Sequence, residues 1–247
     1  TNGFAAGQMI IIAARPAMGK STLALDVARA AAIGAGATTV FFSLEMGRAE
    51  IAMRLLSAEA TIPMQTLRKG ALDQNDFRKL AATQARINEA PLFIDDSPNL
   101  TLVEIRAKCR RLKQRHDLKM VVIDYLQLLS SGKKAESRQQ EVSEFSRALK
   151  LLSKELEVPV VALSQLNRAS EQRADKMPAI SDLRESGSLE QDADMVILLH
   201  RESTYEKDNP RAGEADLILA KQRNGPTGTV TVAFQGHYSR FQNMPSI

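Results

Sequence analysis

Hydrophobic residues along this chain fall into short runs of strand length, separated by longer segments in which apolar positions recur with helical spacing. The expected strands are Gln8–Ala13, Thr38–Leu44, Leu92–Asp95, Met120–Asp124, Val158–Ser164, Met195–His200, Leu217–Lys221 and Thr229–Phe234. Most are nearly continuous apolar runs. That pattern is typical of strands buried on both faces of a sheet.

Helices are expected between these strands. Their ranges are Lys20–Ile33, Arg48–Ala58, Asp73–Glu89, Thr101 to about His116, and Glu141–Leu156. Pro63 breaks the segment between the second and third helices. Thr101 and Glu104 have the spacing of a capping box, in which each side chain binds the other residue's backbone N–H at a helix start.

Alternating strands and helices predict one α/β domain over residues 1–247, with a mostly parallel sheet flanked by helices. The turn sequence Asn224–Gly228 joins the last two expected strands and predicts an antiparallel hairpin at the edge of the sheet. Two polar stretches, Ser130–Arg138 and Arg168–Pro178, are either surface loops or loops that face a ligand.

The composition is ordinary for a globular protein, with 44% hydrophobic and 25% charged residues. No apolar run approaches the roughly 20 residues that a membrane helix needs, and Thr1–Gly7 lacks the features of a signal peptide. We therefore expect a cytoplasmic protein with no membrane partner. The chain enters its first strand almost at once, so we expect a domain of a longer protein. Cys109 is expected to be a buried helix cysteine.

Charge and aromatic content restrict the kind of partner. The net charge of +4 permits an anionic partner without requiring one. The chain has no Trp, and aromatic residues make up only 4% of it, which argues against nucleic-acid binding by base stacking. If the chain binds DNA or RNA, we expect contacts from cations and backbone N–H groups to phosphates.

The segment Ala14–Ser21 matches the phosphate-binding pattern G-x-x-x-x-G-K-[ST], with Ala14 in place of the first glycine. An apolar strand precedes the segment and an amphipathic helix follows it, as phosphate binding at a helix N-terminus requires. An incidental strand, turn and helix is the alternative interpretation. Nucleotide-binding residues are therefore expected to be Ala14, Arg15, Pro16, Ala17, Met18, Gly19, Lys20, Ser21 and Thr22.

Each of three residues has a distinct expected role in this loop. Gly19 lets the backbone approach the phosphates, Lys20 supplies the cation for the β- and γ-phosphates, and Ser21 offers a hydroxyl to Mg²⁺. A carboxylate for the metal should end a neighbouring strand. Asp124 and Asp95 both do so, and we favour Asp124 because the apolar run after it should hold it rigidly.

Hydrolysis also requires a group that orients the attacking water. Glu45 follows the second strand, where it could face the γ-phosphate, although its spacing alone favours an exposed loop residue. Gln165 ends the strand Val158–Ser164 and has the same ambiguity, because it could contact the γ-phosphate or simply cap a loop.

Six segments together resemble the DnaB-type replicative helicases. They are Ala13–Thr22, Ser43–Met46, Ile123–Leu128, Ser164–Arg168, Ser181–Asp194 and Ala220–Gly228. The resemblance covers essentially the whole chain, and the last two segments are far more specific than the phosphate-binding loop. It implies a RecA-like fold and an ATP-driven homohexameric ring that moves 5′ to 3′ on single-stranded DNA, with ATP and Mg²⁺ as ligands.

The resemblance also implies roles for particular residues. Glu45 becomes the catalytic base, Asp124 the Mg²⁺-linked carboxylate, and Gln165 the residue that couples nucleotide state to DNA contact. Lys221 and Arg223 would reach the γ-phosphate of the neighbouring subunit's ATP. Without the resemblance, Arg223 is simply a surface arginine beside a turn.

Arg184, Glu185 and Gly187 fall in the segment that this family presents to the DNA backbone; on its own pattern, that segment is a capped surface helix. The family's N-terminal domain and linker helix are expected to be absent, so ring formation and binding of primase or a helicase loader would involve regions partly missing here. A RecA-like recombinase and an ATP-gated loader or scaffold with little turnover are the alternative functions.

Overall fold

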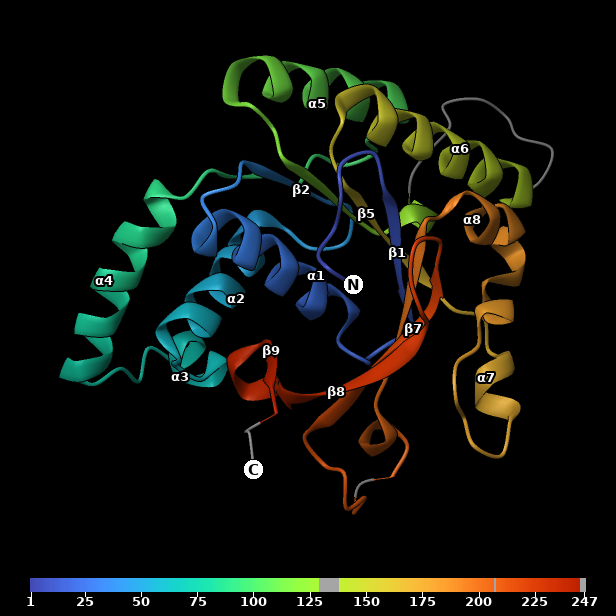
Figure 1. Cartoon of the computed structure of the whole chain (residues 1–247). Coiled ribbons are helices and arrows are strands. Elements are labelled where there is room, and N and C mark those ends of the chain that lie inside the picture. Colours follow the sequence, from blue (N-terminus) through green and yellow to red (C-terminus); the bar gives the residue numbers. More distant parts are fainter. Residues whose placement is uncertain (129–137, 207, 245–247) are drawn as a thin grey trace.

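The computed structural model describes residues 1–128, 138–206 and 208–244 (Figure 1). Its strands are β1 (Met9–Ala14), β2 (Thr39–Ser43), β3 (Leu92–Asp95), β4 (Met120–Asp124), β5 (Val160–Gln165), β6 (Met195–His200), β7 (Glu214–Gln222), β8 (Gly228–Gln235) and β9 (Arg240–Asn243). Its α-helices are α1 (Lys20–Arg29), α2 (Arg48–Ala60), α3 (Met64–Lys69), α4 (Gln74–Glu89), α5 (Leu102–His116), α6 (Arg138–Leu156), α7 (Ala169–Gln172) and α8 (Gly187–Asp192).

The strands form one sheet, in the order β3-β2-β4-β5-β1-β6-β7-β8-β9. From β3 to β6 all neighbours are parallel. The central strand β1 has every side chain buried, with exposed fractions of 0 to 1%. Because successive side chains point to opposite faces, this burial explains its uninterrupted apolar sequence.

Helices cover both faces of the parallel part, as Figure 1 shows. One face packs on α5, α6 and α8 through residues such as Ile105, Phe145 and Leu189. The opposite face packs on α1 and α2 through residues such as Leu25 and Ile51. The predicted α/β class with a mostly parallel sheet is therefore confirmed.

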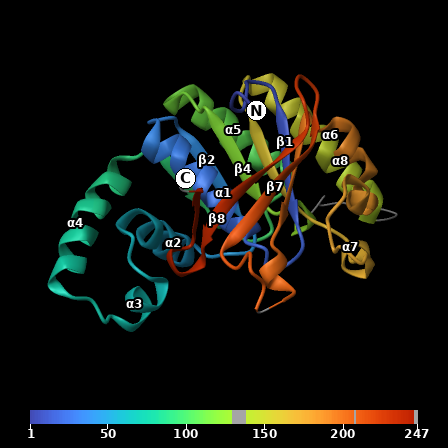
Figure 2. The ribbon, with the colours of Figure 1, turned by 60° about the horizontal axis from the view of Figure 1, so that its bottom comes forward.

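The antiparallel edge is larger than the expected hairpin. Beyond β6, the strands β7, β8 and β9 are all antiparallel to their neighbours. Figure 2 shows β7 and β8 as a long pair whose far end turns back toward α1 and α2. The unexpected strand β9 closes this return, where the Phe241 backbone N–H donates to Asp26 Oδ2 at 2.6 Å. The sheet edge is thereby attached to the helix that follows the phosphate-binding loop.

Several helices differ from the prediction. The first ends at Arg29 and continues as a π-helical turn over Ala30–Gly34. Pro63 does break the chain, and the short helix α3 begins directly after it. The capping box of Thr101 and Glu104 is present at the start of α5. Of the two polar stretches, residues 129–137 lie outside the described residues, and residues 168–178 contain the unexpected helix α7.

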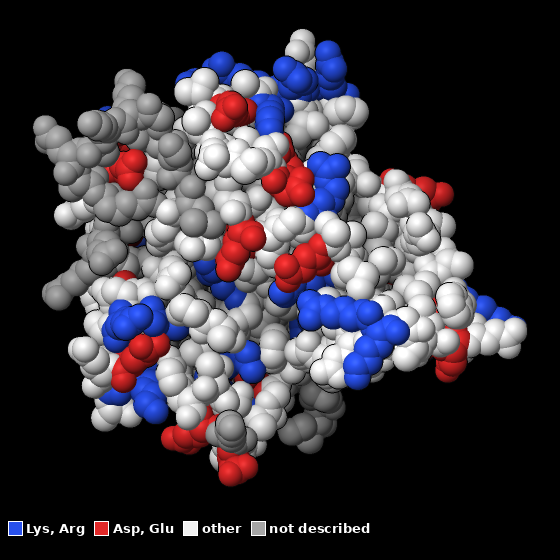
Figure 3. All heavy atoms as spheres, turned by 180° about the vertical axis from the view of Figure 1, so that it is seen from behind, with Lys and Arg blue, Asp and Glu red and all other residues white. Residues whose placement is uncertain are grey.

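Cys109 lies in α5, as expected, and is fully buried. Burial raises the pKa of its thiol to about 12. No helix among the described residues is long and apolar enough to cross a membrane. On the face in Figure 3, acidic and basic side chains are interspersed wherever the structure is described.

Candidate nucleotide-binding site

The predicted phosphate-binding loop connects the end of β1 to the start of α1. Ala14 still belongs to β1 and pairs with Gln165 of β5, so an alanine fits where the pattern has its first glycine. Gly19 has φ 98°, a conformation that other residues rarely adopt. A Cβ at Gly19 would lie 3.0 Å from Phe241 Cζ and 3.3 Å from Phe234 Cε2. Backbone conformation and close packing both require glycine here.

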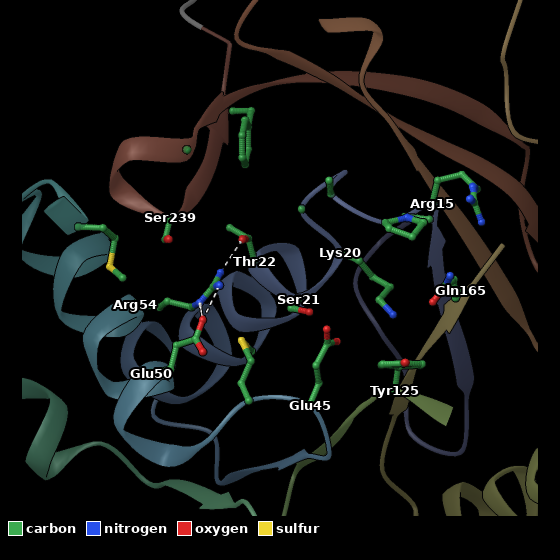
Figure 4. Close-up of a pocket in the computed structure, with 18 of the residues that line it drawn as sticks. Arg15, Lys20, Ser21, Thr22, Glu45, Glu50, Arg54, Tyr125, Gln165 and Ser239 are labelled. Atoms are coloured by element: carbon green, nitrogen blue, oxygen red, sulfur yellow. Dashed lines mark hydrogen bonds and ion pairs between the residues drawn. The ribbon is translucent and has the colours of Figure 1, made fainter. Parts of the chain in front are cut away.

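A cavity of about 640 Å³ opens over this loop (Figure 4). The expected residues that line it are Ala14, Arg15, Pro16, Ala17, Gly19, Lys20, Ser21, Thr22, Glu45 and Gln165. Met18 does not line the cavity, because its side chain is 2% exposed and packs in the core. The structure thus brings together loop, strand-end and helix residues that are distant in sequence.

Lys20 and Asp124 face each other at the floor of this site. Lys20 Nζ lies 3.9 Å from Asp124 Oδ1 and 4.0 Å from the ring centroid of Tyr125. Asp124 is completely buried, and neither of its carboxylate oxygens has a hydrogen-bonding partner within 3.5 Å among the described residues. Burial raises the pKa of Asp124, although the Lys20 charge and the nearby Ser21 hydroxyl act in the opposite direction. Burial lowers the pKa of Lys20, opposed by the charges of Asp124 and Glu45.

Asp95, the other candidate for the metal-binding carboxylate, already has hydrogen-bonding partners within the chain. It ends β3, the outermost parallel strand, and binds Lys108 Nζ at 2.5 Å and Ser97 Oγ at 2.6 Å. The hydrogen bonds from Lys108 and Ser97 outweigh partial burial and hold the pKa of Asp95 below its usual value. These contacts of Asp95 agree with the preference for Asp124, which rests on the apolar run that follows it in the sequence.

Asp124 and Ser21 suit a magnesium ion. Mg²⁺ prefers hard oxygen ligands and usually keeps several waters and substrate oxygens, so few protein ligands are needed. A buried carboxylate without hydrogen bonds is costly unless a cation approaches it. Among the described residues, no group of three or more His, Cys, Asp or Glu could hold a metal by itself. A metal here would thus depend on ligands from a bound phosphate group and water.

Glu45 is exposed in the loop after β2, and Figure 4 shows its carboxylate directed across the cavity toward Ser21 and Lys20. The loop is fixed on both sides of it. Ser43 Oγ donates to the Met46 carbonyl at 2.6 Å, and the Leu44 N–H donates to the Asp124 carbonyl at 2.7 Å. Glu45 is therefore a solvent-accessible carboxylate on a rigid support.

Gln165 is exposed at the end of β5, on the opposite side of the cavity from α2 (Figure 4). Its backbone carbonyl accepts from Gln127 Nε2 at 3.3 Å. Arg15, by contrast, is turned toward the chain beyond β5. It donates to Glu171 Oε1 at 2.8 Å and to the Leu166 carbonyl at 2.7 Å.

The cavity also has residues that the sequence pattern did not single out. They are Met46, Glu50, Arg54, Met64, Arg68, Tyr125, Phe234, Gly236 and Ser239. Arg54 is bound by Glu50 Oε1 at 2.7 Å, and its Nη1 lies 3.5 Å from Thr22 Oγ1. The spacing of Glu50 and Arg54, one helical turn apart, is the only sequence signal for this pair. The others come from distant segments that only the fold assembles.

Lys221 and Arg223 do not reach this cavity in the same chain. Lys221 Nζ donates to the Glu190 carbonyl, and Arg223 Nη2 donates to the Gln191 carbonyl at 2.6 Å. Gly187 is exposed as the first residue of α8. Among the three residues expected to face DNA, the side chains of Arg184 and Glu185 lie outside the described part of the chain.

Comparison with known proteins finds similarity to replicative helicases of the DnaB type. The family model described as DnaB-like helicase C terminal domain matches residues 1–243. A replicative DNA helicase DnaB from Leifsonia xyli subsp. xyli is 77% identical over 247 residues, which are 100% of this chain and 54% of that protein. The same-named helicase from Mycobacterium intracellulare is 66% identical over 91% of this chain and 39% of its own length. The chain spans about half the length of such relatives.

Two solved structures have closely similar folds. One, described as an ATPase domain, has a TM-score of 0.94 and 38% identity, with 98% of this chain and 87% of that chain covered. A DnaB-like replicative helicase, studied with its interactions with primase, also has a TM-score of 0.94 and 38% identity. There the covered shares are 98% of this chain and 59% of the other.

Proposed function

The chain belongs to the family of DnaB-like helicase C-terminal domains, and we propose that it is the motor domain of a replicative DNA helicase. In this proposal it hydrolyses ATP to move 5′ to 3′ along single-stranded DNA and to unwind the duplex at the replication fork. Residues 1–247 act as one RecA-like unit. Family membership does not favour the alternatives of a recombinase or an ATP-gated loader.

The observation that carries this proposal is the buried Asp124 carboxylate, which accepts no hydrogen bond from the described residues and faces Lys20 across 3.9 Å. A buried charge arranged in this way is stabilised when a metal–phosphate group binds beside it. Ser21 and Asp124 would hold Mg²⁺, directly or through water, and the ion would neutralise charge on the phosphates. Lys20 would bind the β- and γ-phosphates.

Glu45 is the proposed base. It would accept a proton from a water molecule whose oxygen attacks the γ-phosphorus, while the bond from that phosphorus to the bridging oxygen breaks and ADP leaves. The exposed carboxylate on a rigid loop supports this role, because water reaches it and its position is fixed. Gln165, on the other side of the cavity, would couple nucleotide state to DNA contact.

Lys221 and Arg223 are proposed to act on the ATP of a neighbouring subunit. Neither residue lines the cavity of its own chain, which supports action in trans. A cation supplied in this way stabilises the charge of the transferring phosphoryl group. The active site would then be complete only in a homohexameric ring.

Single-stranded DNA would be held through its phosphates by the Arg184 side chain and by backbone N–H groups of the segment that contains Glu185 and Gly187, without base stacking. Primase and a helicase loader are further proposed partners. Support for primase comes from the similar helicase whose interactions with primase have been studied.

Turnover of ATP against protein concentration, with and without single-stranded DNA, tests this proposal. Specific activity should rise with concentration, because subunits complete each other's sites, and DNA should raise it further. Constant specific activity that DNA does not change would contradict the motor function. Electron microscopy of the assembled protein separates closed rings from the open filaments of a recombinase.

A further inference from the structure

Lys221 and Arg223 are held within their own subunit at the C-terminal end of helix α8. Lys221 Nζ contacts the carbonyls of Glu190 and Gln191, and Arg223 Nη2 donates to the Gln191 carbonyl at 2.6 Å. The last carbonyls of a helix lack partners within the helix and carry a partial negative charge. The two cations therefore occupy a favourable position without any nucleotide.

A β-bulge in β7 directs the Lys221 side chain toward the carbonyls at the end of α8. Val196 of β6 pairs with Lys221 and Ile197 pairs with Leu219, so Ala220 is an extra residue in β7. In a regular strand Lys221 would lie on the same face as Leu219, which packs on the α1 side of the sheet. The extra residue turns Lys221 to the other face, where α8 lies.

Asp194 provides a further contact for Arg223 beside the end of α8. Its Oδ1 lies 3.5 Å from Arg223 Nη1, and its backbone carbonyl accepts the Arg223 N–H at 2.9 Å. The other oxygen, Oδ2, binds Lys150 Nζ at 2.5 Å and the Met9 N–H at 2.7 Å. One carboxylate is thus shared between a lysine of α6 and the arginine that follows β7. The Asp194 side chain is 12% exposed and that of Arg223 is 46% exposed, so the arginine has room to leave.

We propose that Asp194 and the carbonyls of Glu190 and Gln191 form a docking position that Lys221 and Arg223 leave when they contact the neighbouring subunit's ATP. This inference rests on the proposed action of the two cations in trans. Asp194 is then a positioning residue. A stronger contact between Asp194 and Arg223 keeps the arginine docked in its own subunit, and a weaker contact releases it. Docking free energy is subtracted from the free energy available for engaging ATP.

The docking position links the two proposed functional regions. Helix α8 begins at Gly187, in the segment proposed to face DNA, and ends at the carbonyls that bind Lys221 and Arg223. If DNA binding shifts α8, it alters the docking position at the other end of the helix. By linkage, release of the cations alters α8 in return. DNA would accordingly stimulate ATP turnover by releasing Lys221 and Arg223 from the docking position.

Two substitutions at one ion pair test this role. Asp194→Asn keeps an oxygen for the Met9 N–H but removes the charge that attracts Arg223. ATP turnover without DNA should rise roughly twofold to fivefold, as expected for an ion pair near the surface, and stimulation by DNA should fall by a similar factor. Lys150→Gln removes the competing cation and leaves Asp194 to Arg223. Turnover without DNA should then fall by roughly the same factor.

Opposite directions are the decisive result. Asp194 and Lys150 bind each other, so a merely structural role for the pair predicts that both substitutions lower turnover together. Glu155→Gln is the matched control, because Glu155 is also an ion-paired carboxylate, but it binds Arg106 Nη2 of α5 at 2.6 Å instead of Lys221 or Arg223. We expect this control to leave both turnover and DNA stimulation unchanged.

Changes in the same direction, or no change in Asp194→Asn, would overturn the docking position. Binding of a fluorescent ATP analogue checks that each variant is folded. If Asp194→Asn fails to bind it, Lys150→Gln decides alone. A fall in turnover without DNA that DNA reverses supports the inference, and a fall that is equal with and without DNA, or no fall, overturns it. Full turnover in Arg223→Ala would overturn the proposed function itself, which separates the two failures.

Discussion

Lys20 and Arg223 are two cations proposed for the same reaction, yet they lie in opposite environments. The Lys20 side chain is 12% exposed and faces a carboxylate to which no described residue donates a hydrogen bond. Arg223 is 46% exposed, and its guanidinium already binds the carbonyl of Gln191 and the carboxylate of Asp194. The first is arranged for a ligand that has yet to bind. The second has partners that it must leave.

This difference separates the two halves of the proposed active site. Around Lys20, burial fixes the geometry, so binding a nucleotide requires little rearrangement of the floor of the site. At the antiparallel edge, exposed ion pairs and helix carbonyls hold the cations, and such contacts are individually weak. The edge is therefore suited to a change of position between subunits.

Arg223→Ala should have the largest effect on turnover. A cation supplied in trans contributes about 10³-fold or more to phosphoryl transfer, so kcat should fall by about that factor while ATP binding remains. Turnover and binding of a fluorescent ATP analogue measure the two separately. Arg111→Ala, at an exposed position of α5, is the matched control. Turnover of Arg223→Ala close to that of wild type would contradict a role of this arginine in the reaction.

Glu45→Gln should follow, with turnover lowered by about 10²-fold and ATP binding retained, because a general base contributes on that scale. Glu50→Gln makes the same change of charge in the same cavity, but Glu50 binds Arg54 at 2.7 Å. Its effect should stay below roughly tenfold, the scale of one lost surface ion pair. Equal effects of the two substitutions would mean that Glu45 contributes no more to catalysis than Glu50, and would contradict its role as the base.

Gly19→Ala should destabilise the nucleotide-free protein by about 2 kcal/mol, since φ is 98° and the added Cβ meets two aromatic rings. Gly34→Ala is the control, because that glycine has no positive φ and a Cβ there meets nothing within 4 Å. Urea denaturation of both variants measures the difference. Similar unfolding free energies would mean that the loop relaxes without strain.

Arg211→Gln should have the smallest effect, about 1 kcal/mol at neutral pH, because the arginine side chain is 33% exposed and solvent weakens its ion pairs. Arg211 binds Glu202 at 2.7 Å, Glu214 at 2.8 Å and Asp216 at 2.7 Å. Its hydrogen bond holds the pKa of Asp216 below the ordinary value of 3.8.

A lowered carboxyl pKa in the folded state stabilises the protein above the ordinary pKa, and this contribution is lost as the pH falls through the lowered value. The difference in unfolding free energy between wild type and Arg211→Gln should thus shrink below about pH 4, and also in high salt. A difference that persists in both conditions would mean that packing, rather than charge, holds this edge.

The two halves also differ in how far the sequence predicted them. The prediction that Ala14–Ser21 binds phosphate rests on the residue pattern, because glycine, lysine and serine at fixed spacing between a strand and a helix have few other uses. The preference for Asp124 over Asp95 also came from the sequence, through the apolar run that follows Asp124. The sheet order and the Lys108 contact of Asp95 add physical reasons that the sequence does not contain.

At the edge, residue patterns carried little information. Strand β9 has only four residues, and the contact of Phe241 with Gly19 joins positions more than 200 residues apart. The roles of Lys221 and Arg223 came from family resemblance, since exposed cations near a turn have no distinguishing periodicity. Their contact with α8 depends on a bulge, which the sequence does not mark.

Mixing two inactive variants tests most directly whether the two halves form one site across subunits. Lys20→Ala lacks the cation at the floor of the cavity, and Arg223→Ala lacks the edge cation. In a randomly mixed ring, roughly a quarter of the interfaces combine an intact Lys20 with an intact neighbouring Arg223. The account predicts that the mixture hydrolyses ATP well above the sum of the separate variants, up to about that fraction of wild type. No gain in a mixture shown to co-assemble would contradict it.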